Sequence, residues 1–118
     1  MPQNINYENL LLHGTTTLAF IYQGGVIVSV DSRASAGTMV ATQNIKKIIE
    51  FSPKIIGTMA GSAAACQHAG RRISNSTKMF KMKHNFEPSV RVVSRMLQSF
   101  FRECPTQGRS GIYCFCLN

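Results

Sequence analysis

The sequence of 118 residues lacks any apolar run that approaches the length of a membrane-spanning helix. Its first fourteen residues, MPQNINYENLLLHG, lack the basic start and the long apolar centre of a secretory signal. It also lacks internal repeats and low-complexity linkers, and its length is enough for one domain rather than two. We therefore expect a single intracellular globular domain with no membrane partner.

The spacing of the cysteines argues against a metal centre. The chain has four cysteines but no Cys-x-x-Cys pair, and its three histidines are not at zinc-ligand spacing from them. We interpret the cysteines as buried free thiols of a reducing compartment, with a metal site as the alternative. Cys114 and Cys116 alternate within an apolar run, so we expect both on one side of a strand. No metal and no cofactor are predicted.

Acidic residues are few, with five Asp and Glu against 13 Lys and Arg, for a net charge of +8. Residues 71–118 carry nine basic and two acidic residues, or +7, whereas residues 1–70 carry only +1. Such a basic half is typical of a protein that binds a polyanion such as a nucleic acid. Because the basic residues are scattered without interleaved aromatics, we favour a solvated helix face and predict no nucleic-acid partner.

The hydrophobic pattern of the first sixty residues predicts strands. Alternating and β-branched runs indicate strands over 15–22, 26–34, 46–51 and 54–61, with a short extended piece at 38–42. Gly24-Gly25 is typical of a hairpin turn between the first two strands.

The pattern of the remaining residues predicts two helices and a last strand. Ser62 can cap a first helix whose apolar face would hold Ala65, Ala69 and Ile73, although Ser74-Asn75-Ser76 weakens it. A second helix from Ser89 to Cys104 would bury Val93, Met96, Leu97, Phe100 and Phe101, and 111–118 is one more strand. This order predicts an α+β fold with helices packed over sheets. The last strand would present an apolar edge that invites association with another chain.

Four segments resemble the proteasome β-subunit family in order and spacing: HGTTTLAF (13–20), GVIVSVDSRASAG (25–37), NIKKIIE (44–50) and IIGTMAGSAAAC (55–66). The resemblance is close over 13–66, weaker to about 112, and greatest to the β5 type, which cuts after large apolar residues. It implies an N-terminal nucleophile hydrolase-like αββα sandwich whose C-terminal half is missing. Residues 1–14 would be a propeptide-like segment and residues 15–118 a partial β-subunit domain.

The family's chemistry would explain the sequence Gly14-Thr15. A threonine hydroxyl is a poor nucleophile at neutral pH and needs an adjacent base. Autocleavage between Gly14 and Thr15 would free an α-amine, which titrates at about 7.7–8.0 and can accept a proton. Thr15 would then supply both nucleophile and base for threonine-type endopeptidase activity.

The resemblance also assigns residues that support the nucleophile. Lys47 would be the catalytic lysine and Asp31 its buried partner, since an unpaired buried charge is expensive. Gly61 would donate an oxyanion-hole N–H, and Arg33 would support the site. From the residues alone, Lys47 and Arg33 could each be a surface charge, and Gly61 could be an ordinary turn glycine.

The substrate pocket and the partners follow from the same resemblance. Four small or apolar residues would line the pocket for the residue before the cut bond, although core packing also explains each: Ala34, Ile45, Met59 and Ala63. The partners would be other proteasome α and β subunits in a hetero-oligomeric ring, and the substrate an unfolded polypeptide. The location would be the cytoplasm and nucleus.

Two departures from the family pattern support an alternative. Ala65 stands where the family usually has an aspartate, and family chains run well past residue 118, where the last residues, FCLN, already leave the pattern. Family chains also continue with another aspartate and two serines that surround the threonine. The alternative is a catalytically incomplete structural or interaction subunit, or a truncated gene product.

Overall fold

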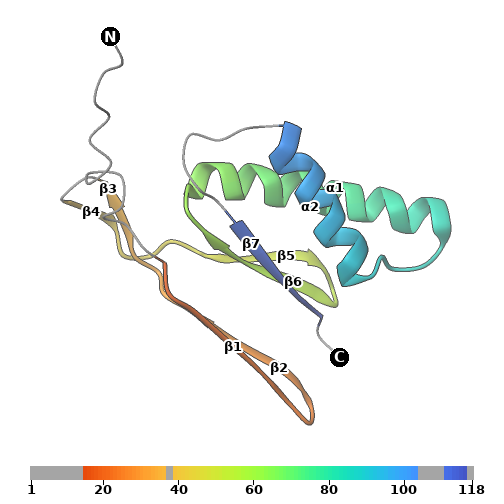
Figure 1. The fold of residues 1–118 in the computed structure, drawn as a ribbon, viewed down its shortest axis with the longest axis horizontal. Coiled ribbons are helices and arrows are strands. Elements are labelled where there is room, and N and C mark those ends of the chain that lie inside the picture. The colour runs from red at the N-terminus through yellow and green to blue at the C-terminus, as the bar shows by residue number, and fades with distance from the viewer. Residues whose placement is uncertain (1–14, 37–38, 104–110, 117–118) are drawn as a thin grey trace.

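The computed structural model describes residues 15–36, 39–103 and 111–116 (Figure 1). Its elements in chain order are β1 (Thr17–Tyr22), β2 (Gly25–Val30), β3 (Ala34–Ala36), β4 (Met39–Thr42), β5 (Ile48–Ser52), β6 (Ile55–Ala60), α1 (Ala63–His84), α2 (Val90–Glu103) and β7 (Gly111–Cys116). The predicted order of strands, two helices and a final strand is confirmed, and the α+β class with it. The propeptide-like segment, residues 1–14, lies outside the described residues.

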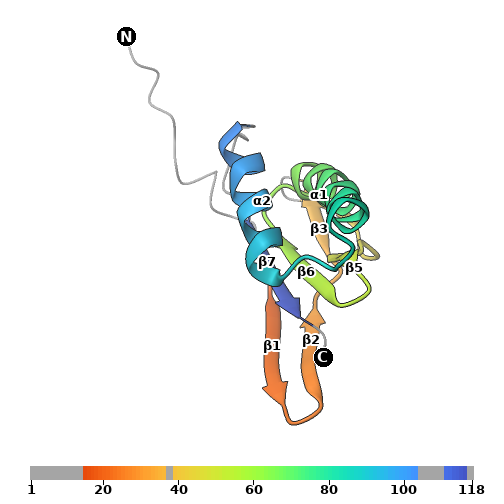
Figure 2. The same cartoon turned by 90° about the vertical axis from the view of Figure 1, so that its right-hand side faces the viewer.

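The strands form three antiparallel sheets. β1 pairs with β2, β3 pairs with β4, and β5, β6 and β7 form a three-stranded sheet with β6 in the centre. Both helices lie on one side of the three-stranded sheet, and the β1–β2 hairpin extends away on its other side (Figures 1 and 2). The radius of gyration is 16.2 Å, which exceeds the ~13 Å of a compact chain of about 100 residues because the hairpin projects from the body.

The core fills the space between the helices and the three-stranded sheet. The predicted stripe of α2 is confirmed, because Val93, Leu97 and Phe100 are buried while Met96 and Phe101 pack against them. These side chains meet a second group from the sheet and from α1: Phe51, Ile55, Ala69 and Ile73. Burial of these large apolar groups supplies the main stabilising free energy of the fold.

Helix α1 runs without interruption through the predicted weak point at Ser74-Asn75-Ser76. The hydroxyl of Ser74 donates to the carbonyl oxygen of Glu50 at 3.1 Å, so it is bonded to β5 instead of competing for the helix backbone. The helix ends at Asn85, which adopts the left-handed conformation with φ 61° and donates its N–H to the carbonyl of Lys81.

Three local predictions are wrong. The predicted strand 26–34 is two strands, because the chain leaves β1 after Val30 and Ser32 binds the segment before β5 instead. Ala65, predicted on the apolar face of the first helix, is only half-buried, whereas Ala69, Ile73 and the predicted buried thiol Cys66 are buried. Cys116 is exposed rather than buried, because it lies at the end of β7, an edge strand of the three-stranded sheet. Cys114 is half-buried, and Cys104 lies outside the described residues.

The β1–β2 hairpin carries an exposed apolar surface. Leu18, Phe20 and Tyr22 alternate along β1, and Ile27 of β2 pairs with Phe20, which places these side chains on one face. Each of them is between 45% and 60% exposed. Two-stranded hairpins are marginally stable on their own, so this surface is suited to contact with another element or chain.

Candidate active site

Asp31 and Lys47 form an ion pair that links the end of β2 to the start of β5. The Nζ atom of Lys47 lies 2.9 Å from Oδ1 of Asp31. The side chain of Lys47 is only 7% exposed, whereas that of Asp31 is 35% exposed. The contact predicted between these residues is confirmed, and Lys47 is not a surface charge. Its catalytic role stays a prediction.

Backbone hydrogen bonds bring the two partners together. The N–H of Ile45 donates to the carbonyl of Ser32 at 2.9 Å, and the hydroxyl of Ser32 donates to the carbonyl of Gln43 at 2.8 Å. On the other side, the N–H of Met59 in β6 donates to the carbonyl of Lys47 at 3.1 Å. The segment before β5 is therefore fixed between the turn after β2 and the central strand of the sheet.

The surroundings of Asp31 keep its carboxyl group charged. The hydrogen bond from Lys47 lowers the pKa of Asp31 below its ordinary value of 3.8, and partial burial opposes this shift. The positive charge of Lys47 and the backbone groups of Thr16 and Arg33 lower this pKa further. At neutral pH the carboxylate therefore balances the buried ammonium group of Lys47.

Thr15 is one residue away in sequence from a backbone contact with Asp31. It directly precedes Thr16, whose carbonyl accepts a hydrogen bond of 3.3 Å from the N–H of Asp31. Thr15 is half-buried at the base of the β1–β2 hairpin. The structure therefore places the proposed nucleophile within one residue of a direct contact with Asp31. Gly14, the other residue of the predicted cleavage site, lies outside the described residues.

Gly61 occupies the junction between β6 and α1. Its φ of 93° lies in the region that residues with side chains rarely adopt, so this turn requires glycine. The next residue, Ser62, caps α1 by accepting the N–H of Ala65 at 3.4 Å. The helix has no acidic residue in its first turn, so the positive end of its dipole is not offset there. This junction can favour a developing negative charge.

The remaining predicted site residues are spread over several elements. Arg33 is exposed just before β3, and three of the pocket candidates are half-buried, in β3, before β5 and at the first position of α1: Ala34, Ile45 and Ala63. Met59 is only 3% exposed. In this conformation Met59 contributes packing rather than open pocket surface, and the role of all four in substrate binding stays a prediction.

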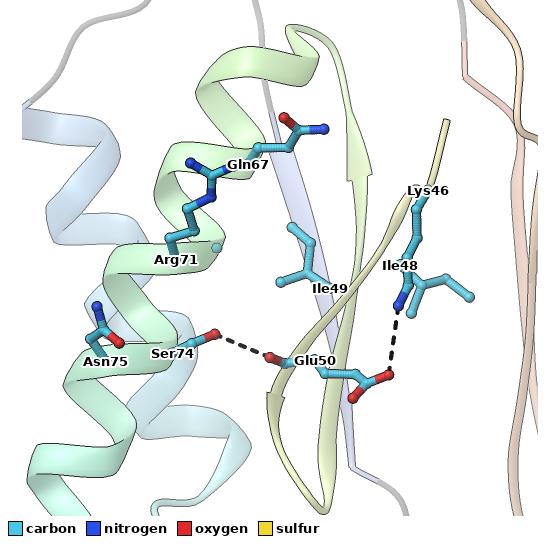
Figure 3. A pocket seen from close by; sticks show the side chains of 9 residues that line it. Lys46, Ile48, Ile49, Glu50, Gln67, Arg71, Ser74 and Asn75 are labelled. Carbon is cyan, nitrogen blue, oxygen red and sulfur yellow. Dashed lines mark hydrogen bonds and ion pairs between the residues drawn. The ribbon is translucent and has the colours of Figure 1, made fainter. Parts of the chain in front are cut away.

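A groove of about 610 Å³ lies elsewhere, between α1 and β5, and includes none of the predicted site residues. Figure 3 shows Lys46 next to Glu50 across its edge and Ser74 bonded to the backbone of Glu50. The Lys46–Glu50 pair is 3.9 Å long and more than 70% exposed on both sides, so it contributes little free energy. These contacts involve three of the polar residues that line the groove, Lys46, Glu50 and Ser74.

Two further findings concern the part of the chain that the structure describes. It contains no cluster of three or more His, Cys, Asp or Glu side chains able to hold a metal ion. Neither of its helices is both long and apolar enough to cross a lipid bilayer.

The sequence pattern of one family matches nearly the whole chain. This family is described as "Proteasome subunit", and the match covers residues 11–117.

Curated relatives of two types align with this chain. Proteasome subunit beta type-5 of Gallus gallus is 41% identical over 100 residues, which are 85% of this chain and 39% of that protein. Proteasome subunit beta type-8 of Rattus norvegicus is 42% identical over 100 residues, which are 85% of this chain and 36% of that protein. Proteasome subunit beta type-5 of Dictyostelium discoideum is 45% identical over 85 residues, which are 72% of this chain and 31% of that protein. The chain thus spans less than two fifths of the length of these relatives.

Proposed function

Because the chain belongs to the proteasome subunit family, we propose that it acts as a type-5 β subunit with threonine-type endopeptidase activity. The single observation that carries the proposal is the buried Lys47–Asp31 ion pair at 2.9 Å, together with the bond from Asp31 to the residue after Thr15. A buried lysine has no packing advantage over an apolar side chain, because burying its charge costs free energy. A role in chemistry accounts for that cost.

The proposed reaction begins with hydrolysis of the Gly14–Thr15 peptide bond. Water is consumed, Gly14 gains a carboxylate, and Thr15 gains a free α-amine. The hydroxyl oxygen of Thr15 attacks the carbonyl carbon of a substrate peptide bond, and the α-amine takes the proton of that hydroxyl. The positive charge of Lys47 stabilises the developing negative charge on the hydroxyl oxygen, and the N–H of Gly61 stabilises that on the substrate carbonyl oxygen.

Collapse of this intermediate would release the first product. The proton held by the α-amine passes to the leaving nitrogen, and an ester remains between Thr15 and the substrate. A water molecule, deprotonated by the same amine, then hydrolyses the ester and restores the hydroxyl. We propose that the bonds cut follow large apolar residues, with the small, half-buried side chains of Ala34 and Ala63 lining the pocket for such a residue.

Mass spectrometry and an active-site probe test this proposal. The intact chain is expected to yield a species that starts at Thr15 and that reacts once with a peptide electrophile directed at N-terminal threonine. Thr15→Ala should abolish both maturation and labelling, while the neighbouring Thr16→Ala should retain them. The proposal would be contradicted if the chain keeps Met1 and does not react with the electrophile. It would also be contradicted if Thr15→Ala still hydrolyses apolar peptides.

A non-catalytic subunit that assembles with other proteasome subunits is the second candidate. The observation in its favour is the exposed apolar face of the β1–β2 hairpin, with Leu18 at 60% and Phe20 at 49% exposed. Co-purification with other α and β subunits, combined with no reaction of Thr15 toward the electrophile, would favour this candidate. Modification of Thr15 would exclude it in favour of the enzyme.

A further inference from the structure

Cys66 joins the first turn of α1 to the end of β6. Its side chain is completely buried, with an exposed fraction of 0%. The Sγ atom lies 3.5 Å from the carbonyl oxygen of Ala60 and 4.0 Å from that of Gly111. A thiol has a single hydrogen to donate, and Ala60 is the nearer acceptor. The sequence indicated only a buried thiol here, because nothing in the pattern reveals which carbonyl it meets.

The carbonyl of Ala60 and the N–H of Gly61 belong to the same peptide group. This group is planar and trans, so its C=O and N–H bonds point in opposite directions. Any interaction that fixes the direction of the Ala60 carbonyl therefore also fixes the direction of the Gly61 N–H. Gly61 needs such support, because glycine is the residue with the greatest backbone freedom.

The pairing of β6 shows which way this N–H points. The N–H of Met59 donates to the carbonyl of Lys47, so the polar backbone groups of Met59 face the β5 side of the strand. Successive residues of a strand alternate, so those of Ala60 face the β7 side, where its paired residue is Gly111. The contacts of Sγ with both carbonyls agree with this direction. The N–H of Gly61 consequently points to the β5 side, where Lys47 lies.

We propose that Cys66 is a positioning residue for catalysis, whose S–H donates to the Ala60 carbonyl and so holds the Gly61 N–H toward the reacting carbonyl. This inference rests on the proposed function, in which Gly61 supplies the oxyanion donor. Cys66 itself touches neither Thr15 nor the substrate in this proposal.

The chemistry of a buried thiol suits this task. Burial raises the pKa of Cys66, so the sulfur keeps its proton at neutral pH and remains a donor. The same side chain also fills apolar space at the junction of helix and sheet, where a larger polar group would need a second partner. A weak donor suffices because the bond only selects one orientation of a peptide group.

Two substitutions separate orientation from packing. Cys66→Ala removes the donor, and Cys66→Ser keeps one. Loss of a whole oxyanion donor typically lowers kcat by about 100- to 1,000-fold. Loss of its orientation is expected to lower the kcat of Cys66→Ala for an apolar peptide by about tenfold with little change in KM. Cys66→Ser should recover most of this loss. Cys114→Ala is the matched control, since this thiol lies in β7 and packs on the core.

The amide signal of Gly61 provides a readout that needs no activity. In a nitrogen-15 NMR spectrum of the full chain, this signal should shift and exchange faster with solvent in Cys66→Ala, and return toward its original position in Cys66→Ser. Cys66→Val, which fills the space of the sulfur but cannot donate, replaces the alanine variant if that protein does not fold. A thermal unfolding scan of each variant identifies any loss of the fold.

The outcomes distinguish this inference from the proposed function. If wild-type Thr15 does not react with the electrophile, the proposed function fails and catalytic positioning fails with it, even where the Gly61 signal responds to Cys66. If Thr15 reacts but folded Cys66→Ala keeps both its kcat and its Gly61 signal, only the positioning role is overturned. A lower kcat that serine restores, together with a shifted Gly61 signal, supports it.

Discussion

Asp31→Asn is expected to destabilise the fold more than Lys47→Met, although both substitutions remove the same ion pair. The two partners differ in burial, because the Lys47 side chain is 7% exposed and the Asp31 side chain 35% exposed. Asparagine leaves a buried ammonium group without a counter-charge. Methionine instead fills the space of the lysine stem and leaves a carboxylate that water and backbone N–H groups still reach.

The burial of the charges sets the expected sizes. Breaking a fully buried pair costs about 3–5 kcal/mol, and the access of water at Asp31 reduces this to about 2–3 kcal/mol for Asp31→Asn. For Lys47→Met we expect about 1 kcal/mol or less, as for a solvent-accessible pair.

Urea denaturation at pH 7, followed by far-ultraviolet circular dichroism, measures both values. With a slope of about 1–3 kcal/mol per molar urea, Asp31→Asn should lower the midpoint by about 1 M or more. The double variant should be more stable than Asp31→Asn alone, because the uncompensated charge is gone. The matched control is Lys46→Met, whose side chain is 78% exposed and which should change the free energy of unfolding by less than about 0.5 kcal/mol.

One result would refute this reasoning. If Lys47→Met destabilises the chain as much as Asp31→Asn or more, the cost is not that of a buried charge left unpaired. The Lys47 side chain would then stabilise the fold by packing, and its proximity to Asp31 would have little energetic meaning.

Three further predictions concern the core and the pH dependence. Gly57→Ala should cost about 1–3 kcal/mol in unfolding free energy, because the added Cβ would lie 2.6 Å from Phe51 and 2.9 Å from Ile112. The control is Gly111→Ala, whose added Cβ meets nothing within 4 Å, and equal effects of the two substitutions in urea titrations would contradict the prediction. Thr77→Val should cost about 1–3 kcal/mol, because the buried Thr77 hydroxyl lies 2.8 Å from the carbonyl of Phe51; a thermal unfolding midpoint no lower than that of Ser76→Ala would argue against it. The stability advantage of the wild type over Asp31→Asn should be full above pH 3.8 and shrink below it, because the folded state lowers the pKa of Asp31. If urea titrations show that the advantage persists well below that pH, it does not come from the charge of the Asp31 carboxylate.

Local pattern was sufficient for much of the fold. The apolar spacing of α2 predicts its buried face because Val93, Leu97 and Phe100 recur every three or four residues, and a helix can bury only one such stripe. The contact of Asp31 with Lys47 was also predicted, although that prediction came from a resemblance over fifty residues rather than from either residue alone. The turn at Gly61 followed from its place between a strand and a helix.

Features that depend on contacts between distant residues could not be predicted from the sequence. The end of β2 at Val30 depends on the bonds that Ser32 makes with Gln43 and Ile45, eleven or more residues away. The partial exposure of Ala65 depends on how α1 is rotated over β6, because its buried neighbour Cys66 lies about 100° away on the helix surface. No local sequence pattern specifies these contacts, because each of them involves a segment far along the chain.

The β1–β2 hairpin has a practical consequence for anyone who handles this chain in solution. Its uncovered side chains, of which Ile21 is 84% exposed, attract other copies, while the net charge of +8 keeps the copies apart. Added salt screens that repulsion over a Debye length of about 10 Å at 0.1 M but leaves the apolar attraction intact. Purified material is therefore expected to stay dispersed in dilute buffer and to turn cloudy as ionic strength rises, the reverse of a protein held together by charge.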